Sequence, residues 1–254
     1  MKNISVLVTA GGTIEDIDNV RGITNHASGR LGSLIADEFA RGGDRVTYLC
    51  GESALRPAIA PCETIVIRGT SQLANELERL LREQPFDCVI HTMAVSDFTP
   101  VGAVGMDELA LAIEDALLSC TSRGVGEAVC AALQTVKAQP AQTKISSKSG
   151  GLVLILEQTP KVIRRIKELQ PATLLVGFKL LSHSREEDLL AAAGGLMADC
   201  GCDYVLANDL RDISGERHAA MLMDRAGNLQ HGGTKAEIAR LIYESVTAKI
   251  GRQK

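Results

Sequence analysis

The sequence has no tryptophan, only 3% aromatic residues and no long apolar run. Many proteins that bind single-stranded nucleic acid stack bases on aromatic side chains, so this scarcity argues against that class. A net charge of −4 provides no basic surface field for a polyanion. We find neither a secretory leader nor an apolar stretch of about 18 residues. We therefore expect a cytoplasmic protein that binds neither nucleic acid nor a membrane.

Cysteine spacing typical of a metal site is also absent. The seven cysteines are odd in number, and the close pair Cys200 and Cys202 forms C-x-C without a following histidine pair. This pattern favours reduced thiols packed as small apolar residues in the cytosol. We expect no metal ion bound directly by side chains of this chain.

What the chain does contain is aliphatic. Hydrophobic residues make up 45% of its 254 residues and charged residues 23%, a balance typical of globular proteins. With few aromatics, the core has to be built from leucine, isoleucine, valine and alanine. The length suits one large domain or one domain with a small appendage.

Short apolar runs alternate with segments of helical spacing. Strands are predicted at 4–9, 45–49, 63–67, 87–91, 152–156, 174–178 and 204–207, and helices at 28–41, 71–84, 107–118, 160–168, 186–199 and 235–250, with one further segment at 219–224. This alternation predicts an α/β protein with a Rossmann-like, doubly wound, mainly parallel sheet and helices on both faces. We expect one domain over residues 1–254, with an insertion or flexible lid at about 100–150 where the rhythm breaks.

A glycine-containing turn follows the first predicted strand. In an open parallel sheet, ligands bind beyond the carboxyl ends of the strands, where this turn lies. Gly11 and Gly12 let the backbone approach a ligand, and free amides beside Thr13 attract phosphate oxygens. The turn matches neither G-x-G-x-x-G nor G-x-x-x-x-G-K-[ST], so a tight turn without a ligand remains the alternative reading.

The segment between that turn and the next helix is more specific. Residues 21–32 combine Arg21, Asn25, His26, Ser28 and several glycines directly before an apolar helix. Ser28 alone is explained as a helix cap. The arginine, however, is suited to holding a carboxylate or phosphate, and the asparagine amide to donating to an oxyanion. We therefore expect a ligand-binding segment.

Two further polar places complete the candidate set. Asp97 follows the fourth predicted strand, where it is placed to bind a ribose hydroxyl or a hydrated Mg²⁺; a turn or cap aspartate is the alternative. Lys144 and Lys148 lie in a polar loop that suits a triphosphate, unless the loop is merely solvated. His91 is read as a hydrogen-bonded core histidine.

Taken in order, these motifs resemble phosphopantothenate–cysteine ligases of the stand-alone bacterial form. The resemblance covers nearly the whole chain except about 101–143. It is carried by Val8-Thr9-Ala10-Gly11-Gly12-Thr13, Ile23-Thr24-Asn25-His26-Ala27-Ser28-Gly29-Arg30, Met93-Ala94-Val95-Ser96-Asp97-Phe98, Lys144-Ile145, Gly177-Phe178-Lys179 and Ala207-Asn208-Asp209.

The resemblance implies a reaction in coenzyme A biosynthesis. The carboxylate of 4′-phosphopantothenate attacks the α-phosphate of CTP, or of ATP, with Mg²⁺ held mainly by the triphosphate. The amine of L-cysteine then attacks the acyl-nucleotide. Asn25 and Lys144 are implied as catalytic. The implied substrate-binding residues are Arg21, Asn25, His26, Ala27, Ser28, Gly29 and Arg30. The implied nucleotide-binding residues are Gly11, Gly12, Thr13, Ala94, Asp97, Lys144, Lys148 and Phe178.

The resemblance also implies a homodimer, with an interface around 152–156 and 174–179. Two departures from the family pattern stand out: Ser146-Ser147 replaces a basic pair, and Leu181-Ser182 replaces Glu-Thr.

Two other functions stay open. One is an NAD(P)-dependent short-chain oxidoreductase, although no tyrosine is followed four residues later by lysine. The other is a non-catalytic nucleotide-binding module, because fold alone does not settle activity.

Overall fold

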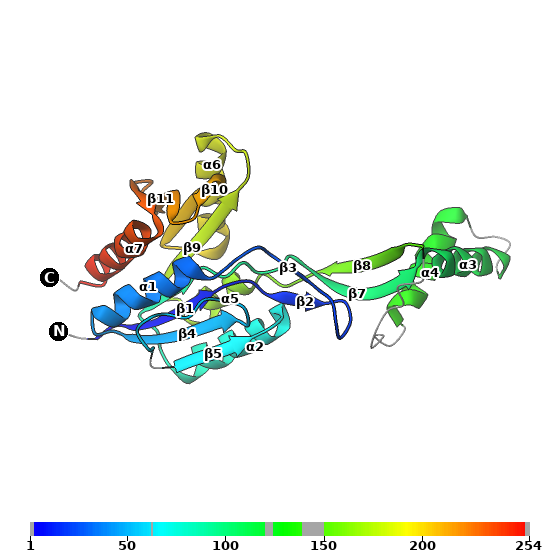
Figure 1. The fold of residues 1–254 in the computed structure, drawn as a ribbon, viewed down its shortest axis with the longest axis horizontal. Helices are drawn as coiled ribbons and strands as arrows, with labels where there is room; N and C mark the ends of the chain where they lie inside the picture. The colour runs from blue at the N-terminus through cyan, green and yellow to red at the C-terminus, as the bar shows by residue number, and fades with distance from the viewer. Residues whose placement is uncertain (1–2, 62, 120–123, 139–149, 252–254) are drawn as a thin grey trace. The chain divides into compact units, whose positions relative to one another are not determined.

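The computed structural model describes residues 3–61, 63–119, 124–138 and 150–251 (Figure 1). The chain divides into two compact units. Unit 1 comprises Met1–Thr13, Asn25–Val95 and Lys161–Lys254, and unit 2 comprises Ile14–Thr24 and Ser96–Pro160. Lys144 and Lys148, both predicted to bind the nucleotide, lie outside the described residues, as do Ser146 and Ser147.

Unit 1 is built around an eight-stranded sheet of order β12-β11-β10-β9-β6-β1-β4-β5. Its strands are β1 (Ser5–Ala10), β4 (Arg45–Gly51), β5 (Glu63–Ile67), β6 (Cys88–His91), β9 (Leu174–Leu181), β10 (Tyr204–Ser214), β11 (Arg217–Asp224) and β12 (Leu229–Thr234). The neighbouring strands β10, β9, β6, β1, β4 and β5 are parallel, whereas β11 pairs antiparallel with both β10 and β12. The predicted Rossmann-like, mainly parallel α/β fold is confirmed.

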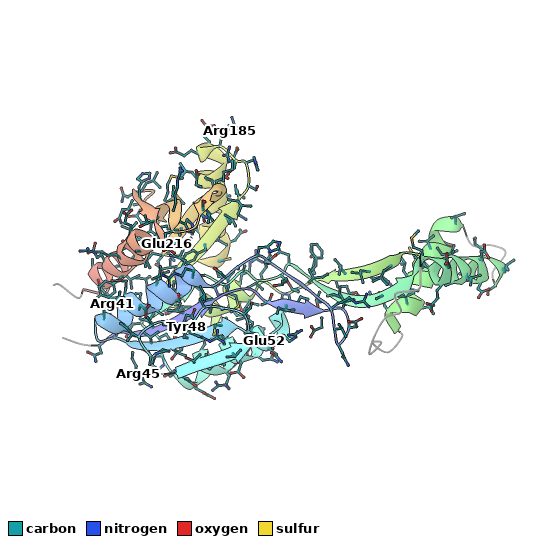
Figure 2. The ribbon with its side chains drawn as sticks, in the orientation of Figure 1. Arg41, Arg45, Tyr48, Glu52, Arg185 and Glu216 are labelled. Atoms are coloured by element: carbon teal, nitrogen blue, oxygen red, sulfur yellow. The ribbon has the colours of Figure 1, made fainter. Side chains whose placement is uncertain are left out.

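Helices cover both faces of this sheet (Figure 1). The helices α1 (Arg30–Arg41) and α7 (Lys235–Lys249) pack on one face, and α2 (Thr70–Glu83), α5 (Val162–Leu169) and α6 (Glu186–Cys200) on the other. The core is aliphatic, as its composition predicts. Aromatic exceptions include Tyr48, labelled in Figure 2 and fully buried, and Phe39, whose ring lies 5.2 Å from that of Tyr243.

The position of β9 corrects one sequence-based expectation. This strand pairs with β6 on one side and β10 on the other, so its backbone is used inside the sheet. Leu174, Leu175 and Val176 are buried beneath the helices. The expectation that 174–179 forms a dimer interface is therefore wrong for the buried part of the segment. An apolar run looks the same in sequence whether helices of its own chain or a partner covers it.

Unit 2 contains two small antiparallel sheets and a helix pair. Strand β2 (Ile14–Asp16) pairs with β3 (Gly22–Thr24), and β7 (Phe98–Gly105) pairs with β8 (Leu152–Gln158). The helices are α3 (Met106–Leu118) and α4 (Val125–Ala138). Helix α3 agrees with the helix predicted at 107–118, whereas α4 lies within the predicted insertion, where the sequence pattern predicts no helix. Within the described ranges, no helix is both long and apolar enough to cross a bilayer.

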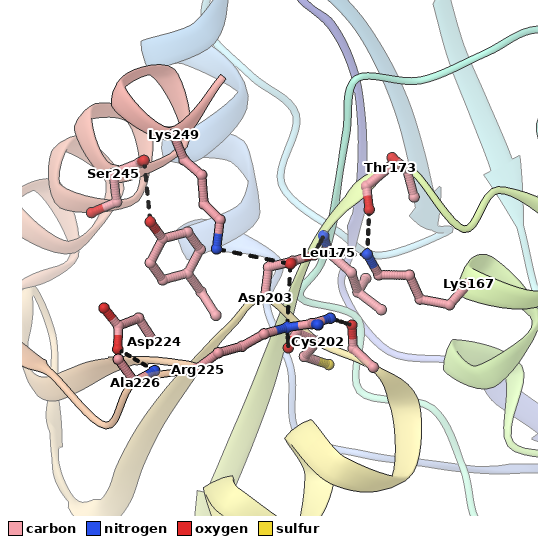
Figure 3. A network of polar contacts seen from close by, with 12 residues as sticks. Lys167, Thr173, Leu175, Cys202, Asp203, Asp224, Arg225, Ala226, Ser245 and Lys249 are labelled. Carbon is pink, nitrogen blue, oxygen red and sulfur yellow. Dashed lines mark hydrogen bonds and ion pairs between the residues drawn. The ribbon is translucent and has the colours of Figure 1, made fainter. Parts of the chain in front are cut away.

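A polar network closes the amino-terminal edge of the unit 1 sheet (Figure 3). Asp203 accepts hydrogen bonds from Lys167 Nζ at 2.8 Å and from the amide of Leu175 at 3.0 Å, and Arg225 Nε lies 3.3 Å away. Burial alone raises the pKa of Asp203, but the hydrogen bonds and the nearby cations outweigh it and lower that pKa. A cavity of about 1250 Å³ is lined by this network, at the edge opposite the predicted site.

Candidate functional site

The carboxyl ends of β1 and β6 are held together by a buried polar cluster. Thr9 Oγ1 lies 2.9 Å from His91 Nδ1, and Thr92 Oγ1 donates to the Thr9 carbonyl at 2.8 Å. Burial lowers the pKa of His91 to about 4, so the ring is neutral at physiological pH. His91 is thus a hydrogen-bonded core histidine, as expected.

The first glycine turn and the start of α1 meet directly above these strand ends. Gly11 has φ +82°, and a Cβ there would lie 2.6 Å from the Ala54 Cβ. Gly29 has φ +72°, and its Cβ would lie 2.9 Å from the same methyl and 3.2 Å from the Gly11 nitrogen. Only glycine adopts this backbone without strain and fits the space. Two backbone segments distant in sequence therefore approach each other at the amino end of a helix.

Ser28 does not cap α1. The cap position belongs to Gly29, which offers no side chain, and Ser28 Oγ accepts only a long 3.4 Å hydrogen bond from the amide of Arg30. The reading of Ser28 as a helix cap is therefore wrong, because Gly29 takes a left-handed conformation that serine disfavours. The amino end of α1 thus has no side-chain cap, an arrangement that suits an anion.

Asn25 reaches this turn from the other side. Its Nδ2 donates to the Ala94 carbonyl at 3.4 Å, and the same carbonyl accepts from the Thr13 amide at 3.2 Å. The Ala94 amide donates to the Gly11 carbonyl at 2.8 Å, and Gly12 forms a parallel bridge with Ala94. The structure therefore brings five predicted residues to one rim of the sheet, and Asn25 is exposed there.

The remaining predicted residues fall at several places. In unit 1, His26 is exposed, Ala27 is half-buried, and Phe178 on β9 packs against the core beneath α1. Arg30 Nε lies 3.8 Å from Glu216 Oε1. In unit 2, Asp97 is exposed, and its carbonyl accepts from the Thr159 amide at 3.0 Å.

Arg21, also in unit 2, is oriented by a residue that sequence reasoning missed. Asp18 accepts from Arg21 Nη2 at 2.6 Å and from Arg21 Nε at 3.1 Å, and its side chain is fully buried. The same carboxylate accepts from the Val20 and Arg21 amides, which closes the turn. The spacing Asp-x-x-Arg after a short strand was the available signal.

A second aspartate, Asp209, organises the loop after β9; the sequence places it in a family motif but not among the predicted site residues. Asp209 accepts from the amide and hydroxyl of Ser184 at 2.7 and 2.8 Å and from Arg211 Nε at 3.0 Å. The hydrogen bonds from Arg211 lead the causes that hold the pKa of Asp209 well below its usual range. The carboxylate therefore stays charged and holds the segment that joins β9 to α6. No cluster of three metal-binding side chains occurs among the residues with described positions.

Fold and site together define a Rossmann-like α/β protein whose glycine turn, helix terminus and asparagine meet at the carboxyl edge of the sheet. The model of the DNA/pantothenate metabolism flavoprotein C-terminal domain family matches residues 1–105 and 115–250. The chain belongs to this family.

Relatives of known name agree with this assignment. A structure titled as the DNA/pantothenate metabolism flavoprotein from Streptococcus pneumoniae is 36% identical, with a TM-score of 0.81, covering 97% of this chain and 99% of that one. The coenzyme A biosynthesis bifunctional protein CoaBC of Thermococcus kodakarensis is 33% identical over 95% of this chain and 50% of its own length.

The fold also matches a solved C-terminal domain of a CoaBC protein. That structure is 20% identical, with a TM-score of 0.68, covering 100% of this chain and 98% of that one, a likeness that concerns the fold alone. The chain spans about half the length of the curated relatives it matches.

Proposed function

We propose that the chain is a ligase domain that joins 4′-phosphopantothenate to L-cysteine through an acyl-nucleotide intermediate in coenzyme A biosynthesis, and that it acts in the cytoplasm. Family membership supports this assignment, as does the name of the Thermococcus relative. The observation that carries it is the convergence of Asn25, the Gly11 turn and the free amino end of α1 at one rim.

The proposed chemistry explains why such a rim is useful. A carboxylate is a poor electrophile, so the acid first attacks the α-phosphate of a nucleotide and pyrophosphate leaves. The amine of cysteine then attacks the acyl carbon, and the nucleoside monophosphate leaves. Both steps depend on positioning and on stabilising negative charge. Backbone amides at Gly11, Gly12 and Gly29 suit the phosphate groups, and the Asn25 amide suits the acyl phosphate.

The nucleotide is proposed to be CTP, with ATP as the alternative, accompanied by Mg²⁺ on its triphosphate. Asp97, Phe178, Lys144 and Lys148 are the proposed nucleotide contacts, and Arg21 and Arg30 the proposed contacts to phosphopantothenate. Both units act as one catalytic domain in this proposal.

A direct test is to incubate the protein with phosphopantothenate, cysteine, Mg²⁺ and each nucleotide in turn. We expect phosphopantothenoylcysteine by mass spectrometry, with pyrophosphate released only when phosphopantothenate is present. Omitting cysteine should stop the reaction at the acyl-nucleotide. Absence of product with every nucleotide would rule out the proposed activity.

Replacing Lys144 with alanine tests the nucleotide-activating step. Loss of a charge that neutralises the triphosphate should slow single-turnover pyrophosphate release by roughly 100-fold, because such groups act mainly in the transition state. Lys137→Ala is the matched control, since Lys137 is a lysine of α4 that pairs with Glu157. Unchanged activation in Lys144→Ala would remove Lys144 from the mechanism.

We propose in addition that the protein is a homodimer, with part of its interface on β8. Leu152 and Leu156 support this location because both are large apolar side chains of one strand, and they are 38% and 40% exposed. Light scattering should give about twice the 27.0 kDa of one chain. A clean monomer mass at micromolar concentration would contradict the homodimer.

A further inference from the structure

His218, at the start of β11, is a buried side chain without an apparent structural purpose. It is 6% exposed, and neither ring nitrogen has a hydrogen-bond partner among the residues that the structure describes. A buried polar group normally has a partner, because leaving one unpaired costs stability. An apolar residue of similar size would pack here at no such cost.

The local backbone is also irregular at this residue. Across β11 and β12, Arg217 pairs with Thr234 but Ala220 pairs with Gly232, so β11 has one extra residue at His218 and Ala219. The register of β10 against β11 shifts beside it as well. Bulges of this kind re-aim side chains and are common next to active sites.

The residue lies close to the proposed substrate-binding segment. Because β11 is antiparallel to β10, it begins at the edge where the parallel strands end. Glu216, two residues before His218, lies 3.8 Å from Arg30, the first residue of α1. Ala220 and Leu222, further along β11, belong to the same core cluster as the α1 residues Ile35 and Phe39.

The state of the ring restricts what it can bind. Burial, followed by the nearby charge of Lys235, lowers the pKa of His218 to about 4, so the imidazole is neutral at pH 7. A neutral imidazole presents one donor and one acceptor. Phosphate oxygens supply hydrogen-bond acceptors only, so they would leave the acceptor nitrogen of the ring unpaired. The negative charge of the nearby Glu216 carboxylate also repels a phosphate. An amino acid supplies both an amino group and a carboxylate, matching the ring and the mixed charges of Glu216, Arg30 and Lys235.

We propose that His218 is part of the subsite for the amino acid co-substrate, accepting a hydrogen bond from its amino group and donating one to its carboxylate. This inference rests on the proposed ligase function. The ring nitrogens are covered in this structure, so binding requires side chains at the rim to move. The nearby Arg30–Glu216 pair is long, and its side chains are 42% and 67% exposed, so it holds its own part of the rim only weakly.

Steady-state and single-turnover kinetics of His218→Phe test the inference. Phenylalanine keeps a planar ring but removes both hydrogen bonds. We expect the KM for cysteine to rise at least tenfold, while pyrophosphate release and the KM values for phosphopantothenate and CTP change less than twofold. The Tm should stay the same or rise, since a buried polar group has been removed. His218→Asn, which keeps a donor and an acceptor, should recover part of the affinity for cysteine.

The control for this experiment is a second histidine, His231 of β12. His231→Phe replaces an exposed histidine of β12 and should leave all three KM values unchanged. An unchanged KM for cysteine, or equal increases for all three substrates, would refute the role of His218. If His218→Phe and His218→Ala both lose Tm in proportion to activity, the histidine is structural and the proposal is wrong. Product formation by the unaltered protein separately decides the ligase function.

Discussion

An Asn25→Asp protein should still form the acyl-nucleotide but should make the amide about 100-fold more slowly or worse. The asparagine amide can donate a hydrogen bond to the acyl phosphate, and its Nδ2 already points along the rim toward the Ala94 carbonyl. Aspartate is nearly the same size but replaces the donor with a negative charge. Losing one donor to a developing oxyanion typically costs a factor of about 100 to 1000.

Two measurements separate the steps. Pyrophosphate release in the absence of cysteine reports activation, and decay of the trapped acyl-nucleotide after cysteine is added reports amide formation. Asn3→Asp makes the same chemical change at an exposed residue just before β1 and should alter neither rate. Amide formation at the normal rate in Asn25→Asp would show that Asn25 does not act on the acyl group.

The site residues that could be predicted from the sequence are those that their own sequence neighbours indicate. Gly11 and Gly29 are recognisable because a strand-to-helix turn needs their left-handed backbone, and both adopt it. The position of Ala94 follows because the parallel strands β1 and β6 bring their carboxyl ends to the same edge. Asn25 was predicted from the polar segment directly before α1. A short continuous apolar run was enough to predict the strands β1, β4 and β6.

The parts that sequence missed depend on distant partners. Ala54 matters only because two glycines pack against its methyl group, and nothing in its own segment indicates that. Asp209 belongs to a motif of the family, but its role in holding the loop after β9 depends on Ser184, 25 residues away in the sequence. Strand β12 includes Gly232 and Gly233, residues that disfavour strands, and it forms because β11 supplies its hydrogen-bond partners.

At the opposite edge of the sheet, Asp203→Asn should be strongly destabilising without touching the proposed site. Asp203 is 14% exposed and joins Lys167 of α5, Arg225 after β11 and Lys249 of α7 (Figure 3). Asparagine would leave these cations facing a neutral group. Breaking a buried ion pair costs about 3–5 kcal/mol. Because Arg225 and Lys249 are half-exposed, we expect about 2–3 kcal/mol and a Tm lower by roughly 8 °C.

The control for this experiment is Asp199→Asn. Asp199 is 67% exposed, and its carboxylate lies 3.8 Å from Arg164, so its loss should change stability by less than about 0.5 kcal/mol. Equal effects of the two substitutions in denaturant unfolding would contradict a special role for the Asp203 network. Ligase activity below the unfolding transition should be the same in both variants.

The pH dependence of stability tests whether the charge of Asp203 causes the expected loss in Asp203→Asn. Hydrogen bonds and cations hold the folded pKa of Asp203 below its unfolded value of about 3.9, so the native state favours the charged form. The contribution of the charged Asp203 side chain to the free energy of unfolding is complete at pH values above its pKa in the unfolded state. This contribution is lost as the pH falls through the pKa of Asp203 in the folded state. The difference in unfolding free energy between the unaltered protein and Asp203→Asn should therefore be constant from about pH 5 to pH 8 and shrink below about pH 4. A difference that persists undiminished in stronger acid would mean that neutral packing around Asp203, rather than its charge, holds this edge together.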